Sequence, residues 1–298
     1  MTETSIRIIA PAKINLYLHI VGRHANGQHL LDSLIAFADI HDTLYLTTSP
    51  ELSLEIDGPF AYQLTSEPNN LVLQAARKLA RLCDVTKGAQ LQLTKNLPVA
   101  SGIGGGSSDA AAVLKGLIQL WKVQPSNQDL QDLALGLGAD VPACLNGQTA
   151  FISGVGEIIS EPKPLPLCFI VLVNSGTLIS TQSVFKIQMK LQSSFSKPGR
   201  FDFSPENLHE FVSILKTCHN DLDQAAQVLC PEIGQVLSEL RNSAGSLLTR
   251  MSGSGATCFA LFSDHEEATE ASLDLKLRHP NWWIKAGSLN SGSSCISK

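Results

Sequence analysis

Residues 98–109 decide the fold, and they read Pro98-Val99-Ala100-Ser101-Gly102-Ile103-Gly104-Gly105-Gly106-Ser107-Ser108-Asp109. The residues before this stretch, 90–94, have the pattern of a strand, and the alanine-rich segment after it, 108–121, favours a helix. Four glycines let the backbone approach a ligand closely and direct several N–H groups inward, and such a nest binds anions. Because the loop leads into a helix N-terminus, the stretch predicts a polyphosphate site that needs no lysine or arginine.

A flexible glycine-rich turn capped by Ser108 is the alternative interpretation of the same residues. The strand, loop and helix context favours nucleotide binding over that alternative. A P-loop is excluded because no lysine follows the glycines, and a dinucleotide fingerprint fails because Ser107 stands where the third glycine is required. The sequence therefore predicts a nucleotide loop of a different design.

Two charged residues outside the loop are candidates for chemistry. Lys13 lies among apolar neighbours at the start of a predicted strand, 14–20, and its alternative role is that of an edge-strand lysine. Asp140 precedes Val141-Pro142, and its alternative role is to cap a short helix. Phosphoryl transfer to an alcohol needs a carboxylate to accept the hydroxyl proton and a cation nearby, and Asp140 and Lys13 could fill these roles.

A second loop of small residues occurs late in the chain, at Met251-Ser252-Gly253-Ser254-Gly255-Ala256-Thr257-Cys258. Alone it is a turn signal. The two loops could face each other across a cleft, with one on the nucleotide and the other closing over the phosphates.

The remaining pattern mixes strands and helices. Strands are predicted at 43–47, 52–56, 168–173 and 257–262, and helices at 71–82, after Ser126 to about Gly136, and within 205–244. Residues 161–166 hold three prolines in an extended connection, so we place a domain boundary there and expect two lobes, 1–160 and 161–298, that share a cleft. A length of 298 residues suits this division.

Composition limits the partners. Hydrophobic residues make up 44% of the chain and charged residues 16%, which suits a packed interior. The formal net charge of −5 without a basic cluster argues against nucleic acid. Seven scattered cysteines without a C-x-x-C pair argue against disulfides and zinc, and no segment has the pattern of a signal peptide or membrane span, so we expect a cytoplasmic protein.

Taken together, the glycine stretch and the 252–257 loop resemble the superfamily of kinases that includes galactokinase, homoserine kinase, mevalonate kinase and phosphomevalonate kinase. Within it, further motifs resemble the family of 4-diphosphocytidyl-2-C-methyl-D-erythritol kinases. These motifs are Pro11-Ala12-Lys13-Ile14-Asn15-Leu16, Gly22-Arg23, Gly27 with His29, Gly138-Ala139-Asp140-Val141-Pro142, and Asn220-Asp221-Leu222.

This resemblance implies an α+β fold of two lobes, with a ribosomal-protein-like N-terminal lobe and an α/β C-terminal lobe around a deep cleft. It implies ATP with Mg²⁺ as cofactors. It also implies the substrate 4-diphosphocytidyl-2-C-methyl-D-erythritol, which the family phosphorylates on the tertiary 2-hydroxyl in the non-mevalonate (methylerythritol phosphate) route to isoprenoid precursors. The magnesium ligands and the choice between monomer and homodimer stay open.

The resemblance also implies roles for individual residues. Asp140 orients and deprotonates the hydroxyl, Lys13 offsets the developing charge, and the backbone of residues 98–108 wraps the ATP phosphates. The implied substrate-binding residues are Asn15, Gln28, His29 and Phe185, with His29 on the cytosine edge and Phe185 on its face. A surface histidine and a core phenylalanine are the alternatives for the last two.

The chain departs from the family pattern at Gln28, where the family usually has a tyrosine that stacks on cytosine. An amide cannot stack as an aromatic ring does, so we expect the cytosine base to be bound less tightly. Two rival functions remain, a related kinase acting on homoserine or mevalonate and a nucleotide-binding module without catalysis. The residues around Lys13 and His29 argue against the first, and retention of Lys13 and Asp140 argues against the second.

Overall fold

The computed structural model of this chain describes residues 5–25, 27–64, 70–191, 194–289 and 296–297. The first half contains β1 (Ser5–Arg23), β2 (His29–Ser49), β3 (Ser53–Asp57), the short 3-10 helix η1 (Ala61–Gln63), α1 (Leu71–Leu82), β4 (Gly88–Thr94), α2 (Gly105–Trp121), α3 (Asn127–Leu135), α4 (Val141–Asn146), β5 (Ala150–Gly154) and β6 (Ile158–Ser160). The second half contains β7 (Cys168–Asn174), α5 (Thr181–Lys190), α6 (Leu208–Lys216), α7 (Asp223–Leu229), α8 (Glu232–Asn242), β8 (Leu248–Met251), β9 (Cys258–Phe262), α9 (His265–Arg278), β10 (Trp283–Leu289) and β11 (Ile296–Ser297).

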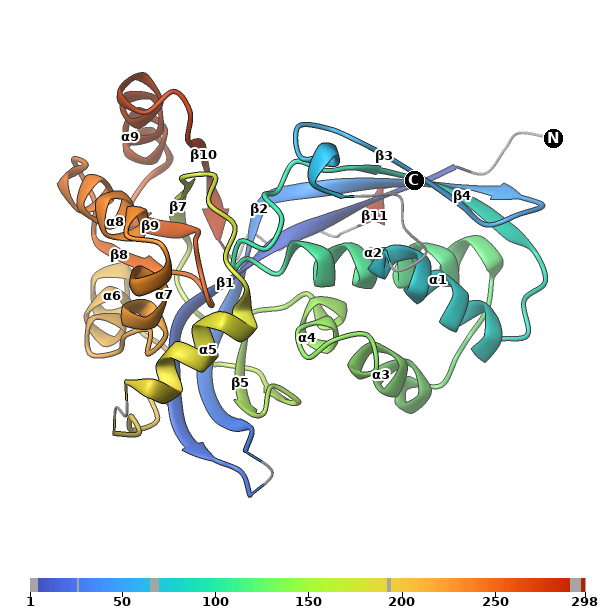
Figure 1. Cartoon of the computed structure of the whole chain (residues 1–298), viewed down its shortest axis with the longest axis horizontal. Helices are drawn as coiled ribbons and strands as arrows, with labels where there is room; N and C mark the ends of the chain where they lie inside the picture. The colour runs from blue at the N-terminus through green and yellow to red at the C-terminus, as the bar shows by residue number, and fades with distance from the viewer. Residues whose placement is uncertain (1–4, 26, 65–69, 192–193, 290–295, 298) are drawn as a thin grey trace.

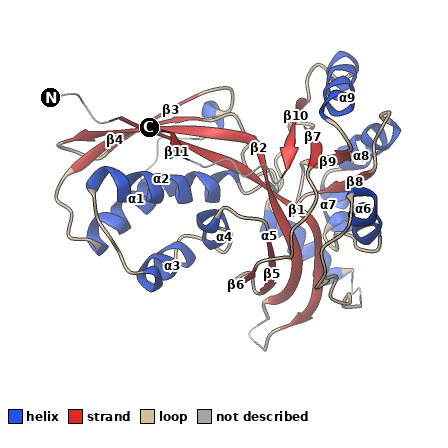
Figure 2. Ribbon diagram, turned by 180° about the vertical axis from the view of Figure 1, so that it is seen from behind, coloured by secondary structure: helices blue, strands red, loops and turns tan. Residues whose placement is uncertain are grey.

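Strand β2 connects the two halves. It pairs with β1 along most of its length, with β4 through residues 43–49, with β5 through residues 31–35, and with β10 at Ala38. These pairings are antiparallel, and β3 lies parallel to β4. The β1–β2 hairpin therefore runs through the middle of the molecule and contributes to both halves (Figures 1 and 2).

In the first half, α1 and α2 cover one face of the β1, β2 and β4 sheet (Figure 1). The predicted helix at 71–82 is confirmed as α1, and its buried residues Val72, Ala75 and Leu79 pack in this core at helical spacing. Helix α2 lies close to the sheet, since a Cβ at Gly116 would come within 2.8 Å of the Leu46 side chain. The strand before the glycine loop and the helix after it are therefore both fixed in this core.

In the second half, β7, β8, β9 and β10 carry helices α7, α8 and α9. Leu18 and Ile20 of β1 belong to the same hydrophobic core as these helices. Arg250 of β8 is buried and donates hydrogen bonds to the carbonyl oxygens of Leu16, Leu215 and Cys218, and burial lowers its pKa to about 10. Hydrophobic packing and the hydrogen bonds of Arg250 therefore hold the central hairpin against the second half of the molecule.

The expected α+β architecture is confirmed, and the differences lie in element boundaries and in elements that the sequence pattern did not predict. Strands β1 and β2 extend well beyond the predicted 14–20 and 43–47, and in β2 continuous burial of residues 32–36 hides the alternation that marks a strand. Helix α2 begins at Gly105 rather than Ser108. Helices α5 and α9 and strands β8 and β10 were not predicted.

Candidate active site

The glycine loop lies between β4 and α2, as predicted. Gly104 occupies the N-cap position of α2 with φ 63°, a left-handed conformation that glycine adopts without strain. It has no side chain to cap the helix, so amides of the first turn remain available to an anion. Ser108 does not cap the helix, because its hydroxyl donates to the carbonyl oxygen of Pro11, so the alternative of a Ser108-capped turn is wrong.

Lys13 and Asp140 meet directly beside this loop. Lys13 Nζ lies 2.8 Å from Asp140 Oδ1, although the two residues are 127 positions apart in the sequence. A Cβ placed on Gly104 would come within 3.2 Å of Lys13 Cβ, so the lysine packs against the loop. One ammonium group therefore lies between the loop and a carboxylate.

The positions of the two side chains argue against the edge-strand role of Lys13 and the helix-capping role of Asp140. The Lys13 side chain is only 6% exposed, which is not the solvated position of an edge-strand lysine. Asp140 does precede α4, but its side chain makes no capping hydrogen bond and bonds Lys13 instead. Its side chain is 50% exposed, so a molecule in solution can reach the carboxylate.

The second small-residue loop braces the first by direct contact. The Ser252 hydroxyl donates to the Gly102 carbonyl oxygen and accepts from the Asn15 backbone N–H, at 2.9 and 3.1 Å. The Thr257 N–H donates to the Ser101 carbonyl oxygen at 3.0 Å. A Cβ on Gly102 would lie 2.3 Å from the Ser252 carbonyl oxygen, so glycine is required there. The two loops therefore touch, and do not face each other across an open cleft.

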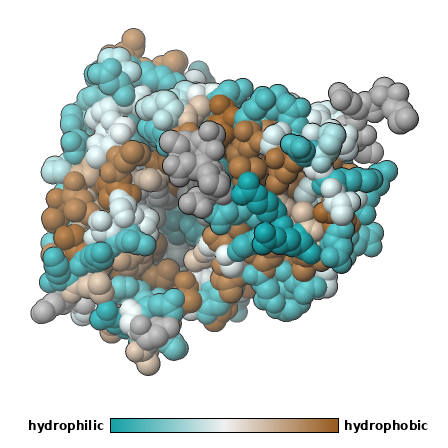
Figure 3. All heavy atoms as spheres, turned by 45° about the vertical axis from the view of Figure 1, so that its right-hand side comes forward, coloured by the Kyte–Doolittle hydropathy of each residue, from teal (hydrophilic) through white to brown (hydrophobic). Residues whose placement is uncertain are grey.

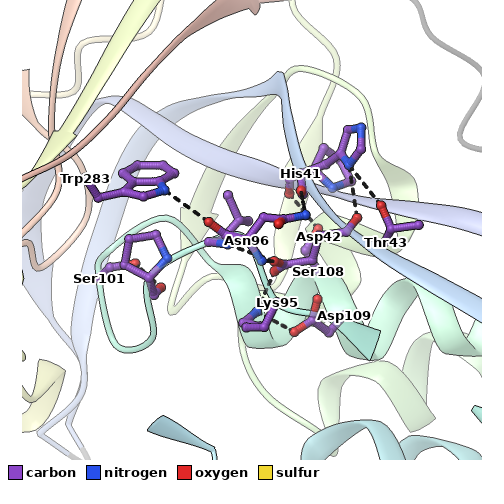
Figure 4. Close-up of polar contacts among 12 residues, drawn as sticks. His41, Asp42, Thr43, Lys95, Asn96, Ser101, Ser108, Asp109 and Trp283 are labelled. Carbon is purple, nitrogen blue, oxygen red and sulfur yellow. Dashed lines mark hydrogen bonds and ion pairs between the residues drawn. The ribbon is translucent and has the colours of Figure 1, made fainter. Parts of the chain in front are cut away.

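A buried charge cluster, consisting of Asp42, Lys95 and Asp109, lies beneath the glycine loop (Figure 4). Lys95 Nζ is 2.5 Å from Asp42 Oδ2 and 2.6 Å from Asp109 Oδ2, and the three side chains are at most 3% exposed. Burial raises the pKa of Asp109 to about 7 although Lys95 opposes the shift. Burial alone would lower the pKa of Lys95, but the two carboxylates outweigh it and raise that pKa.

Sequence reasoning did not assign a role to this cluster. In the sequence, Asp109 is the last residue of the glycine stretch and Lys95 directly follows the predicted strand 90–94. The available signal was a lysine immediately before a nucleotide loop, followed by an acid in the first turns of the next helix.

A cavity of about 340 Å³ opens beside the loop, and its lining includes Leu71, Val72, Lys95, Pro98, Gly106 and Asp109. A Cβ placed on Gly106 would meet no atom within 4 Å, so the loop is open on that side. Figure 3 shows that the surface of the molecule is hollowed between its two halves. The loop therefore borders space for a ligand.

The predicted substrate residues occupy two places. Asn15 is buried near the second loop, where its Nδ2 donates to Ser33 Oγ at 2.9 Å and its Oδ1 has no partner among the described residues. His29 and Phe185 lie together, with ring centroids 5.1 Å apart and planes at 31°. Burial, followed by the nearby Arg23, lowers the pKa of His29. Gln28, the residue before His29, is exposed in the turn that connects β1 and β2.

Several further properties concern only the part of the chain that the structure describes. No helix there is long and apolar enough to span a membrane. No group of three or more His, Cys, Asp or Glu side chains in those residues is arranged to hold a metal ion. The six described cysteines are free thiols, and Cys295 lies outside the described residues.

Comparison with known proteins identifies relatives across the whole chain. The family described as "GHMP kinases N terminal domain" matches residues 70–148, and "GHMP kinases C terminal" matches residues 206–280. A relative from Paramagnetospirillum magneticum named 4-diphosphocytidyl-2-C-methyl-D-erythritol kinase is 46% identical over 286 residues, which cover 96% of this chain and 99% of that protein. A relative of the same name from Ruegeria pomeroyi is 47% identical, with 95% and 99% covered.

Solved structures agree with these matches. A crystal structure of 4-(cytidine 5'-diphospho)-2C-methyl-D-erythritol kinase superposes with a TM-score of 0.76 at 30% identity, covering 96% of this chain and all of that one. A mevalonate kinase from L. major superposes with a TM-score of 0.71 at 16% identity, covering 98% of each chain, and supports the fold alone.

Proposed function

This chain belongs to the family of 4-diphosphocytidyl-2-C-methyl-D-erythritol kinases, and on that basis we propose how its site works. The enzyme transfers the terminal phosphoryl group of ATP to the 2-hydroxyl of 4-diphosphocytidyl-2-C-methyl-D-erythritol, a step of the non-mevalonate route to isoprenoid precursors. The observation that carries the assignment of the site is the contact of Lys13 with Asp140 beside Gly104.

Asp140 is the proposed proton acceptor. Its carboxylate is half-exposed and bonded to Lys13, so it can accept the proton of an incoming hydroxyl while the lysine holds its orientation. As the hydroxyl oxygen bonds to the terminal phosphorus, the bond from that phosphorus to the bridging oxygen breaks and ADP leaves. Lys13, placed between Asp140 and the loop, offsets the negative charge on the reacting oxygens. Positioning supplies most of the rate enhancement.

ATP fits the glycine loop because the amides of residues 98–108 and the N-terminus of α2 lie beside the cavity. Mg²⁺ in kinases takes most of its ligands from the phosphates and water, with one or two carboxylates, and it neutralises charge on the transferring group. We therefore propose Mg²⁺ as the cation that accompanies ATP.

The acceptor is proposed to extend from Asp140 past Asn15 toward His29 and Phe185. Asn15 is proposed to contribute to this side of the site, where its Oδ1 lies against Gly253 of the second loop without a hydrogen-bond partner among the described residues. The contact between His29 and Phe185 offers an aromatic surface for a base, and the exposed Gln28 directly precedes His29 in the sequence. We propose that His29, Phe185 and Gln28 bind the cytidine end of the substrate.

The setting of the enzyme is also proposed. The described free cysteines suit a reducing cytoplasm, and a monomer or homodimer without nucleic acid or membrane partners suits a small-molecule kinase. We place the lobe boundary between residues 160 and 161, in the connection from β6 to β7.

One assay tests the function. The protein is incubated with ATP, Mg²⁺ and 4-diphosphocytidyl-2-C-methyl-D-erythritol, and phosphorus NMR follows the new phosphate ester. Homoserine and mevalonate serve as control alcohols. We expect an ester with the first acceptor alone. Turnover of a control alcohol in its place would assign the chain to another acceptor, and nucleotide binding without any ester would contradict catalysis.

A further inference from the structure

The segment that leads into the glycine loop, residues 95–97, is held by one buried carboxylate. Asp42 Oδ1 accepts the backbone N–H groups of Asn96 and Leu97, at 2.5 and 2.8 Å, and its Oδ2 accepts Lys95 Nζ. Asp42 lies on β2 and is completely buried. Three consecutive residues immediately before Pro98 are therefore tied to a strand of the central hairpin.

Lys95 extends this tie to the other end of the loop. Its Nζ donates to Asp109 in α2, and a Cβ placed on Gly105 would lie 3.2 Å from the same nitrogen. The ammonium group therefore lies directly under the first residue of the helix. The loop from Pro98 to Gly104 spans two points that are both anchored on the same buried charge cluster.

Asn96 makes two further contacts, one with the C-terminal half and one with β2. Trp283 Nε1 of β10 donates to the Asn96 carbonyl oxygen at 3.1 Å, and Asn96 Nδ2 donates to the His41 carbonyl oxygen at 3.3 Å (Figure 4). Every one of these contacts joins parts of the chain that are far apart in sequence. They act on the backbone that precedes the loop and leave the loop's own amides unused.

We propose that Asp42 is a positioning residue, which sets the conformation of the nucleotide loop through Lys95 and the Asn96 and Leu97 amides. This inference rests on the proposed function, since it concerns how the same loop binds ATP. Charge-assisted hydrogen bonds to a buried carboxylate are strong, and loss of a buried partner leaves donors unsatisfied. A shift of the segment would displace the loop amides that are aimed at the phosphates.

The test replaces Asp42 by Asn and measures the dissociation constant of a non-hydrolysable ATP analogue by calorimetry. The amide oxygen can still accept the two backbone N–H groups, but the amide nitrogen then opposes the Lys95 ammonium, donor against donor. We expect the analogue to bind about tenfold or more weakly, the worth of one charge-assisted hydrogen bond. The Michaelis constant for the alcohol should not change.

Asp39→Asn is the matched control. Asp39 lies on the same strand and accepts two hydrogen bonds from Ser288 of β10, but it does not contact the segment before the loop. Its substitution should leave the binding of the analogue unchanged. A role of Asp42 in stability alone would lower the melting temperature and leave the dissociation constant of the folded fraction at the wild-type value.

Trp283→Phe covers the case in which Asp42→Asn does not fold. It keeps a ring in place and removes the indole N–H that holds the Asn96 carbonyl, so it should weaken analogue binding in the same direction and by less. A folded Asp42→Asn protein with wild-type analogue binding would overturn the proposal, and so would unchanged binding in Trp283→Phe when Asp42→Asn is unfolded. Failure of the proposed function differs from both, because the wild type would then bind the analogue and not phosphorylate the alcohol.

Discussion

The two ends of the candidate site are built differently. At the transfer end, Lys13, Gly104 and Asp140 come from separate elements and are already in contact, above a buried charge cluster. At the base end, His29 of the hairpin meets Phe185 of α5 through one ring contact between half-buried side chains. If the proposed roles hold, the groups for phosphoryl transfer are held in place by several elements, whereas the base would depend on a single ring pair. Changes at the first end should therefore alter turnover, and changes at the second should alter affinity.

Asp140→Asn is the change with the largest expected effect. The amide can still accept the Lys13 hydrogen bond, but it cannot accept a proton, so turnover should fall by about 10²- to 10⁴-fold while ATP binding stays nearly unchanged. Steady-state kinetics and calorimetry with an ATP analogue measure the two quantities. Asp132→Asn on the exposed surface of α3 is the control. Near-normal turnover in Asp140→Asn would remove Asp140 from the mechanism.

Lys13→Met should follow closely. Methionine preserves much of the buried volume and removes the cation, so turnover should fall by about 10²-fold, the usual effect of losing one charge-stabilising group. Because Asp140 is half-exposed, water can solvate its carboxylate and the protein should still fold. Nucleotide affinity should change less than turnover. Unchanged kinetics would return Lys13 to a purely structural role on its strand.

Gly104→Val tests whether the glycine loop binds the phosphates of ATP. The position has φ 63°, which a β-branched residue strongly disfavours, and the new Cβ would press against Lys13 at 3.2 Å. We expect ATP affinity to weaken by about tenfold, the effect of losing roughly one hydrogen bond to the phosphates. Gly176→Val is the matched control, since Gly176 has φ 92° and open space around its Cβ. Wild-type ATP affinity in a folded Gly104→Val protein would contradict phosphate binding by the glycine loop.

Local patterns in the sequence predicted the local structure well. The helix at 71–82 and the strand before the glycine loop are confirmed, because periodicity and turn residues act over a few positions. The start of α2 was missed by three residues, because glycine has a low helix propensity and yet Gly105 and Gly106 form the first positions of the helix after the left-handed N-cap Gly104. The Ser126 cap of α3 is confirmed by its bond to the Asp129 N–H.

Contacts between distant segments could not be read from spacing. Lys13 and Asp140 were joined by the chemistry of phosphoryl transfer and by the resemblance to a family, since no local rule joins residues 127 positions apart. Lys95 was missed for a related reason. Its environment depends on Asp42 and Asp109, which reach it from a strand and a helix only after folding. The roles of Asn15, Gln28, His29 and Phe185 stay predictions, although the structure brings His29 and Phe185 together.

Gln28→Tyr has the smallest expected effect and tests the base end alone. Stacking of a base on an aromatic ring is typically worth about 1–3 kcal/mol, and an amide supplies little of it. Gln28 is exposed and directly precedes His29, so a tyrosine there would not have to enter the core, and on the proposed placement it would add a ring at the base end. The Michaelis constant for 4-diphosphocytidyl-2-C-methyl-D-erythritol should fall by up to about tenfold while turnover holds, because the added contact is equal in ground and transition states. Gln131→Tyr, on the exposed surface of α3, should leave that constant unchanged. Weaker binding by Gln28→Tyr would mean that Gln28 makes a specific hydrogen bond to the substrate or that the base lies elsewhere, and either result would overturn the placement of the cytidine between Gln28 and Phe185.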